Sequence, residues 1–132
     1  LVRQLCQRLR IPNQYQELGV LTALYHTHVH RAFELRPATL LKTLQELDAL
    51  RRPQRFMQFL IACEADARGR LGFADSTYPQ AALMRNVLAA AQAVTTHPLL
   101  EQGLSGLQLA KALQEQRLAA VSALRHALIE PV

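Results

Sequence analysis

Apolar residues recur every three to four positions along most of the chain, which places them on one face of an α-helix. Several of these patterns begin next to a proline, at Pro12, Pro37, Pro53 and Pro79, and proline is favoured in the first turn of a helix. No segment alternates apolar and polar residues as a half-buried strand would. The predicted helices cover residues 1–9, 13–33, 37–47, 53–69, 79–94 and 105–128, the last as one helix or two. The predicted fold class is therefore all-α, an irregular bundle of about six to seven helices.

Each predicted helix has one apolar face, which we expect to point inward. At the helix ends, Asn13 offers a capping side chain beside Pro12, and Ser105 can cap the last helical stretch. Gly69 is expected to follow the end of the 53–69 helix in a left-handed turn. The inward positions are Leu18, Leu21, Tyr25, Val29 and Ala32, then Leu40, Leu44 and Leu47, then Leu83, Val87, Ala90 and Val94, and finally Leu109, Leu113, Val121, Leu124 and Leu128.

The composition agrees with a helical domain whose core is built from Leu and Ala. Half of the 132 residues are apolar, but aromatic residues make up only 5% and Trp is absent. No apolar run approaches the roughly 20 residues that a membrane-spanning helix needs, so we expect a cytoplasmic protein without a membrane partner. Cys6 and Cys63 lie in apolar helical patterns, and we expect free thiols rather than a disulfide.

The charge is basic and is carried by arginine. The net charge is +5, with 13 Arg and only 2 Lys. The planar guanidinium group suits phosphate, which favours a nucleic-acid partner. An arginine-rich source organism would give the same bias, and composition alone does not separate the two.

The first residues, LVRQLCQRLR, contain no initiator Met, and Leu1, Leu5 and Leu9 already have helical spacing. We therefore expect a piece of a longer protein.

A histidine cluster in LYHTHVH is the first candidate for chemistry. His26 and His30 are four residues apart and share a helix face, as two metal ligands must. A usable site needs a third ligand, which only Asp66 could supply through the fold. Surface or capping histidines are the alternative interpretation.

Two arginine sets are candidates for phosphate contact. Arg51, Arg52 and Arg55 stand at the start of the 53–69 helix, where cations oppose the helix dipole. They either pair with Glu46 and Asp48 or face an anion such as phosphate.

The second set lies in EADARGR, at the end of the same helix. Arg68 and Arg70 are candidates for phosphate contact, and Gly69 would re-aim Arg70 through its left-handed turn. Glu64 and Asp66 oppose the dipole there, so we interpret Glu64, Asp66 and Gly69 as structural, with the carboxylates pairing with arginines or loop amides. No Gly-rich phosphate loop, nucleophile elbow, HExxH or His-Asp doublet occurs, so the sequence contains no catalytic residues that we can name.

Several segments together resemble a known family. They are RLRIPNQ, YHTHVHRAFELRPATLLK, DALRRPQR, CEADARGRLGF, YPQ and GLSG, in this order along nearly the whole chain. The chain resembles the C-terminal portion of bacterial CCA-adding enzymes, the tRNA nucleotidyltransferases, and among them the multifunctional kind. EADxRGR-x-GF followed by YPQ is the most specific element.

The resemblance implies an enzyme that restores the 3′-terminal CCA of tRNA from CTP and ATP with Mg²⁺. Its catalytic head would lie outside this chain, which then needs no cofactor of its own. Residues 1–73 would be the end of an HD-like body region and residues 74–132 the tail helices, in one compact unit. These regions would hold the acceptor and TΨC arms of tRNA, and a homodimer is possible.

The multifunctional members also carry an HD-type phosphohydrolase domain that uses a divalent metal. In those relatives an Asp follows the first histidine, whereas this chain has Thr27 after His26. A remnant of such a metal-dependent site is one alternative function. A purely structural or dimerising helical module is another.

Overall fold

The computed structural model describes residues 1–70, 72 and 75–129, and within them every regular element is helical. The prediction of an all-α fold is confirmed. The elements are α1 (Val2–Arg8), α2 (Asn13–His30), the 3₁₀ turn η1 (Ala32–Glu34), α3 (Pro37–Glu46), α4 (Pro53–Arg68), α5 (Pro79–Ala93), α6 (His97–Glu101) and α7 (Gly106–Ile129). The last stretch is thus one long helix, and the helix predicted over 13–33 ends at His30 before a 3₁₀ turn.

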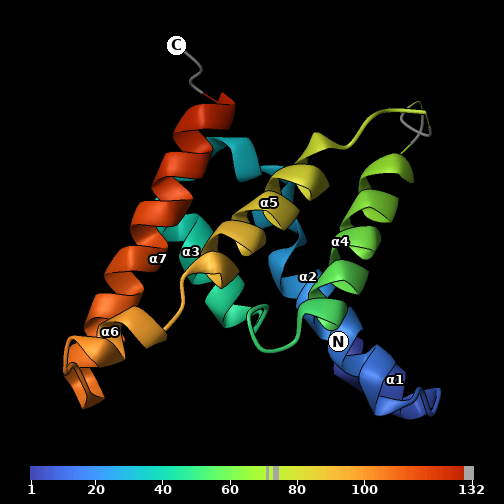
Figure 1. The fold of residues 1–132 in the computed structure, drawn as a ribbon. Coiled ribbons are helices and arrows are strands. Elements are labelled where there is room, and N and C mark those ends of the chain that lie inside the picture. The colour runs from blue at the N-terminus through green and yellow to red at the C-terminus, as the bar shows by residue number, and fades with distance from the viewer. Residues whose placement is uncertain (71, 73–74, 130–132) are drawn as a thin grey trace.

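Helix α5 crosses the middle of the molecule, with α7 on one side and α4 on the other (Figure 1). Helix α2 packs along α4, and α3 packs against α7. Helix α1 lies at the periphery and contacts α2. One core therefore draws on helices from both halves of the chain.

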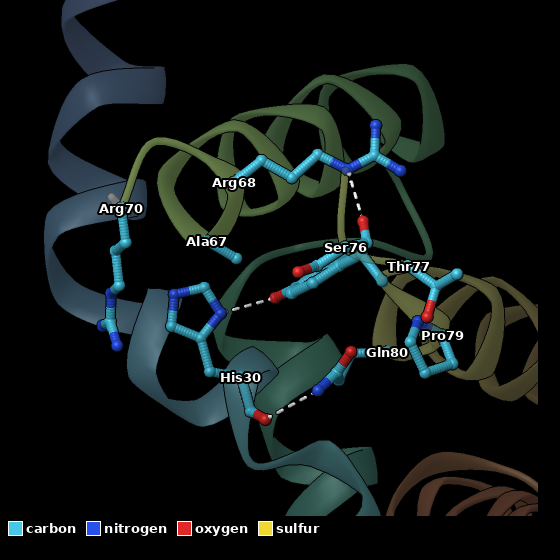
Figure 2. A pocket seen from close by; sticks show the side chains of 9 residues that line it. His30, Ala67, Arg68, Arg70, Ser76, Thr77, Pro79 and Gln80 are labelled. Carbon is cyan, nitrogen blue, oxygen red and sulfur yellow. Dashed lines mark hydrogen bonds between the residues drawn. The ribbon is translucent and has the colours of Figure 1, made fainter. Parts of the chain in front are cut away.

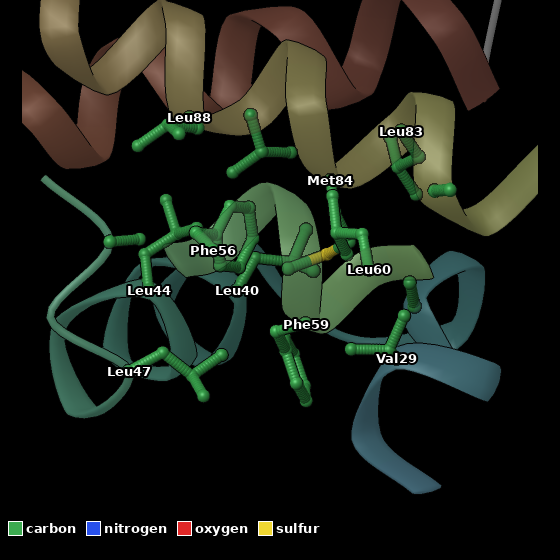
Figure 3. Packing of buried hydrophobic residues seen from close by; sticks show 14 of the residues in the cluster. Val29, Leu40, Leu44, Leu47, Phe56, Phe59, Leu60, Leu83, Met84 and Leu88 are labelled. Carbon is green, nitrogen blue, oxygen red and sulfur yellow. The ribbon is translucent and has the colours of Figure 1, made fainter. Parts of the chain in front are cut away.

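That core is apolar and is built mainly from leucine (Figure 3). Phe56 and Leu60 of α4 lie on the side that faces Met84 and Leu88 of α5, and the Phe59 ring lies 6.0 Å from that of Phe56. All five side chains are almost completely buried. The other members of the core cluster are Val29, Ala32, Leu40, Leu41, Leu44, Leu47, Ala49, Cys63, Tyr78, Ala81, Leu83, Val87, Ala91 and Val121.

Three of the four prolines stand where the sequence placed them. Pro37, Pro53 and Pro79 are the first residues of α3, α4 and α5. Pro12 instead precedes α2 in an extended conformation, and Asn13 is already helical. The predicted Asn13 cap is therefore wrong, because a residue with helical backbone angles is past the capping position and no side-chain cap bond forms there.

The predicted left-handed turn at Gly69 is also wrong. Gly69 has φ −71° and ψ −8°, a right-handed conformation, and its N–H donates to the carbonyl of Ala65 at 2.9 Å. Positive φ occurs three residues later, at Gly72, with φ +85°. Arg70 therefore follows α4 without a reversal at Gly69.

About half of the predicted inward positions are buried, and the exceptions are on α2, α5 and α7. On α2, Leu18, Leu21 and Tyr25 are only partly buried and pack against the core cluster. On α5, Ala90 and Val94 are only partly buried. Contacts with both α4 and α7 give this helix a wide buried surface, so Met84, Leu88 and Ala91 also enter the core. Over residues 106–128 of α7, only Val121 is fully buried, and Leu128 is 48% exposed.

Both cysteines are free thiols, as predicted. Cys6 is partly exposed and Cys63 is buried. Burial, and secondarily the charge of Asp66, raises the pKa of the Cys63 thiol to about 12. Cys63 is therefore a neutral core side chain at physiological pH.

Among the described helices, none combines the length and the apolar character that a membrane-spanning helix needs.

We predict that Leu44→Ala lowers the free energy of unfolding by about 2–5 kcal/mol, because Leu44 is fully buried and the truncation leaves a cavity. Chemical denaturation followed by circular dichroism would measure this. Leu107→Ala is the control, since Leu107 is 89% exposed and its loss should change stability by less than about 0.5 kcal/mol. Equal losses in the two variants would contradict the described core.

Candidate functional site

Helix α4 has arginines at both of its ends. Arg51, Arg52 and Arg55 surround its first turn, and Arg68 and Arg70 surround its last. A rise of 1.5 Å per residue places Arg55 and Arg68 about 20 Å apart along the helix axis. The two predicted arginine sets are therefore separate features of one helix and do not form a single cluster.

In the first set, Arg51 and Arg52 are the exposed members. The Arg51 side chain is 84% exposed and approaches Asp48 at 3.8 Å, one of its two predicted partners. Arg52 pairs with Glu17 of α2 at 3.4 Å, a partner that the sequence did not indicate. Glu46, the other predicted partner, approaches Lys42 at 3.8 Å. An open hollow of about 520 Å³ lies beside this set and is lined by Gln14, Arg51, Arg52, Pro53, Gln54, Arg55 and Gln58.

Arg55 is used inside the fold. Its side chain is only 16% exposed and lies 3.6 Å from the Glu17 carboxylate. One of its terminal nitrogens donates to the carbonyl of Leu47, just past the end of α3, at 2.8 Å. Arg55 thus joins α2, α4 and the end of α3 through its two terminal nitrogens, while its buried Nε has no hydrogen-bond partner among the described residues.

In the second set, Arg68 is held and Arg70 is exposed. Arg68 Nε donates to the carbonyl of Ser76 at 3.0 Å (Figure 2). Another nitrogen of Arg68 lies 3.5 Å from Glu64. Arg70 forms no hydrogen bond or ion pair with any residue that the structure describes. Its side chain is exposed, and its charge acts on the Asp66 carboxyl group.

The two carboxylates of EADARGR have different partners. Glu64 pairs with Arg68, as predicted. Asp66 instead accepts a hydrogen bond from His30 Nε2 at 2.8 Å. This hydrogen bond is the largest effect on the pKa of the Asp66 carboxyl and lowers it; desolvation opposes it, and electrostatic interactions with the two histidines and with Arg70 lower the pKa further.

His30 is the centre of a short hydrogen-bonded chain. A carboxylate can only accept, so the Nε2 that faces Asp66 carries the hydrogen. In a neutral imidazole, Nδ1 then accepts from the Tyr78 hydroxyl, at 2.6 Å. The Gln80 amide donates to the backbone carbonyl of His30 at 3.2 Å (Figure 2). Burial raises the pKa of the Tyr78 hydroxyl, which keeps it a neutral donor.

Tyr78 and Gln80 are functional-site neighbours that the sequence did not single out beyond the YPQ motif. They lie 48 and 50 residues from His30 in the sequence, and no local pattern indicates the contact.

The fold does bring the proposed metal ligands together. The rings of His26 and His30 lie 5.6 Å apart, and Asp66 contacts His30. However, Asp66 and Tyr78 occupy both ring nitrogens of His30, and His26 Nδ1 faces the carbonyl of Thr22 at 2.7 Å. Among the described residues, no group of three His, Cys, Asp or Glu side chains is arranged to hold a metal ion.

Comparison with curated proteins gives close matches over nearly the whole chain. A "Multifunctional CCA protein" of Nitrosococcus oceani is 55% identical over 126 residues, which is 96% of this chain and 31% of that protein. One from Pseudomonas syringae pv. syringae is 53% identical over 121 residues, 92% of this chain and 30% of that protein. One from Pseudomonas aeruginosa is 55% identical over 117 residues, 89% of this chain and 28% of that protein.

The chain belongs to the multifunctional CCA protein family. It spans about a third of the length of the relatives that it matches. The resemblance to CCA-adding enzymes of the multifunctional kind, which the sequence segments indicated, is thereby confirmed. No protein-family model and no solved structure matches the chain. In this member of the multifunctional CCA family, the described site is thus one helix with exposed arginines near both ends and a histidine-centred contact at its C-terminal end.

We predict that Asp66→Asn destabilises the fold near neutral pH by at most about 1 kcal/mol, because Asp66 is half exposed. A carboxyl group whose pKa is lower in the folded state stabilises the fold above its unfolded pKa. That contribution is lost as the pH falls through the folded pKa. The stability difference between the two proteins should therefore shrink below the ordinary aspartate pKa of 3.8. Urea denaturation across a pH series would measure this difference in the free energy of unfolding.

The same substitution in a His30→Gln background is the control. An undiminished pH-dependent difference in that background would rule out the His30 hydrogen bond as its cause.

We predict that Arg55→Lys lowers the free energy of unfolding by about 1–3 kcal/mol, because an ammonium cannot reach both the Leu47 carbonyl and Glu17 in the same geometry. Thermal or chemical denaturation would measure it. Arg51→Lys is the matched control, with a change below about 0.5 kcal/mol at this exposed position. If the two variants lost the same free energy of unfolding, the structural role assigned to Arg55 would be wrong.

Proposed function

We propose that this chain is the tRNA-binding helical region of a CCA-adding tRNA nucleotidyltransferase. In this proposal it positions the acceptor and TΨC arms of tRNA for a catalytic head outside the chain. The head would add the 3′-terminal CCA from CTP and ATP, with Mg²⁺. The observation that carries the proposal is that a member of the multifunctional CCA family has exposed arginines at both ends of one helix.

The arrangement of these arginines suits a double-stranded RNA backbone. Arg51 and Arg70 lie near opposite ends of α4, which at 1.5 Å per residue is more than about 20 Å long. Contacts so far apart can engage two separate phosphates of an RNA helix. Double-stranded RNA is recognised mainly by its shape and its phosphate and 2′-hydroxyl positions, so binding of this kind needs no base sequence.

The arginines differ in how much charge each can offer to RNA. Arg55 and Arg68 are bound to carbonyls and carboxylates of the chain itself. Arg52 shares Glu17 with Arg55 and is half exposed. Arg51 and Arg70 are the members of the two sets with the weakest internal pairing, so we assign the strongest phosphate contacts to them.

We predict that the chain binds both whole tRNA and an acceptor–TΨC minihelix, with similar affinity and with a steep loss of affinity as salt rises. Arg51→Ala and Arg70→Ala should each weaken binding and reduce the slope of log affinity against log salt by about one. Fluorescence anisotropy over a salt series would measure both quantities.

Arg36→Ala is the control for this experiment, because Arg36 is exposed and lies outside both sets. The variant should leave the affinity and the salt slope unchanged. If neither RNA binds at low salt, the proposed function is wrong. If Arg36→Ala reduces the slope as much as the two test variants do, the assignment to α4 is wrong.

A further inference from the structure

An open hollow of about 270 Å³ lies where the end of α4 meets the segment before α5. The residues that line it and matter for its chemistry are His30, Ala67, Arg68, Arg70, Thr77 and Pro79 (Figure 2). Two features distinguish this hollow from a flat basic surface. Hydrogen bonds within the chain fix its walls, and those walls are partly apolar.

The walls are fixed by hydrogen bonds within the chain. Asp66 and Tyr78 hold the His30 ring from both of its nitrogens, at 2.8 and 2.6 Å. The Gln80 amide holds the His30 backbone, and the Ser76 carbonyl holds Arg68. The shape of the hollow therefore does not depend on a ligand to order it, which lowers the entropic cost of binding.

The lining combines an apolar surface with one available cation. Ala67, Pro79 and the methyl group of Thr77 are apolar. Of the charged groups nearby, Glu64 pairs with Arg68 and Asp66 with His30. Arg70 makes no hydrogen bond or ion pair with the described part of the chain, although its charge is felt by Asp66. The arrangement suits a ligand with a flat, weakly polar ring and an anionic group.

We propose that this hollow takes one unpaired nucleotide, with the base in the hollow and its phosphate against Arg70. A backbone phosphate of paired RNA would need only the arginine, whereas an unpaired base also fills the apolar part. That the nucleotide belongs to a bound RNA rests on the proposed function. A free mononucleotide presents the same base and phosphate, and the experiment separates the two sources.

The test follows the backbone amide signals of the isotopically labelled chain by NMR during titration with CMP and AMP. Both should shift the Ala67 and Thr77 signals to saturation. Arg70→Ala should weaken the binding of both by about tenfold or more, since it removes the charged contact. Arg36→Ala, an exposed arginine elsewhere, should leave it unchanged. Cytidine and inorganic phosphate should each bind at least about tenfold more weakly than CMP, because each offers one half of the contact.

Two RNA probes then identify the source of the nucleotide. A short single-stranded oligonucleotide should shift the same signals, and a fully paired minihelix should leave them in place while still binding the chain. If only the mononucleotides shift these signals, the hollow is a free-nucleotide site.

Three outcomes overturn the proposal: CMP and AMP produce no saturable shift, inorganic phosphate binds as well as CMP, or Arg36→Ala weakens CMP binding as much as Arg70→Ala does. If tRNA binds through Arg51 but CMP does not enter the hollow, this inference fails and the proposed function remains. If CMP binds but tRNA does not, the proposed function fails and the hollow remains a nucleotide site.

Discussion

The contact of His30 with Asp66 and Tyr78 joins three segments that are far apart in the sequence: the end of α2, the end of α4 and the residues before α5. An imidazole can serve two partners at once, because one ring nitrogen donates while the other accepts. The side chain is only 17% exposed, and its neighbour Val29 is fully buried in the core. This contact is one of those that fix the position of the EADARGR segment and of the hollow beside it, together with the Arg68–Ser76 hydrogen bond and the core residues of α4. Both carboxylates at the end of α4 thus have partners within the chain, His30 for Asp66 and Arg68 for Glu64.

Arginine in this chain has two kinds of role, which composition cannot separate. Arg55 donates to the carbonyl of Leu47, just past the end of α3. Arg125 donates to the carbonyls of Phe33, inside the turn η1, and of Leu35, just past it. These guanidinium groups serve carbonyls at or near the ends of helical elements and tie those elements to α4 and α7. Arg51 and Arg70 remain largely free of such contacts among the described residues. A basic net charge therefore overstates the number of cations that a phosphate can reach.

Helix α5 explains why the two halves of the chain share one core. It contacts α4 on one side and α7 on the other, so its buried positions are not confined to one stripe. The segment that precedes it supplies Tyr78 to the histidine contact and Thr77 to the hollow, and its own first residue, Pro79, also lines the hollow. Helix α5 therefore contributes residues to the core and, at its beginning, to the wall of the proposed nucleotide site.

The sequence by itself determined the features that arise within one helix. Proline in the first turn and leucine at helical spacing predicted where α3, α4 and α5 begin and how Leu40, Leu44 and Leu47 are buried. The order of the family-like segments predicted the relationship that the curated relatives confirm. These inferences succeed because helix periodicity and proline geometry are local properties of the backbone.

The tertiary structure alone decided which side chains meet. The pairing of His30 with Asp66 spans 36 residues, that with Tyr78 spans 48, and Glu17 reaches Arg52 across 35. Such contacts depend on how helices cross, and a change of one turn in packing would exchange the partners. The Gly69 prediction was wrong for a related reason: glycine permits a left-handed turn, but the surrounding chain decides whether that turn is used.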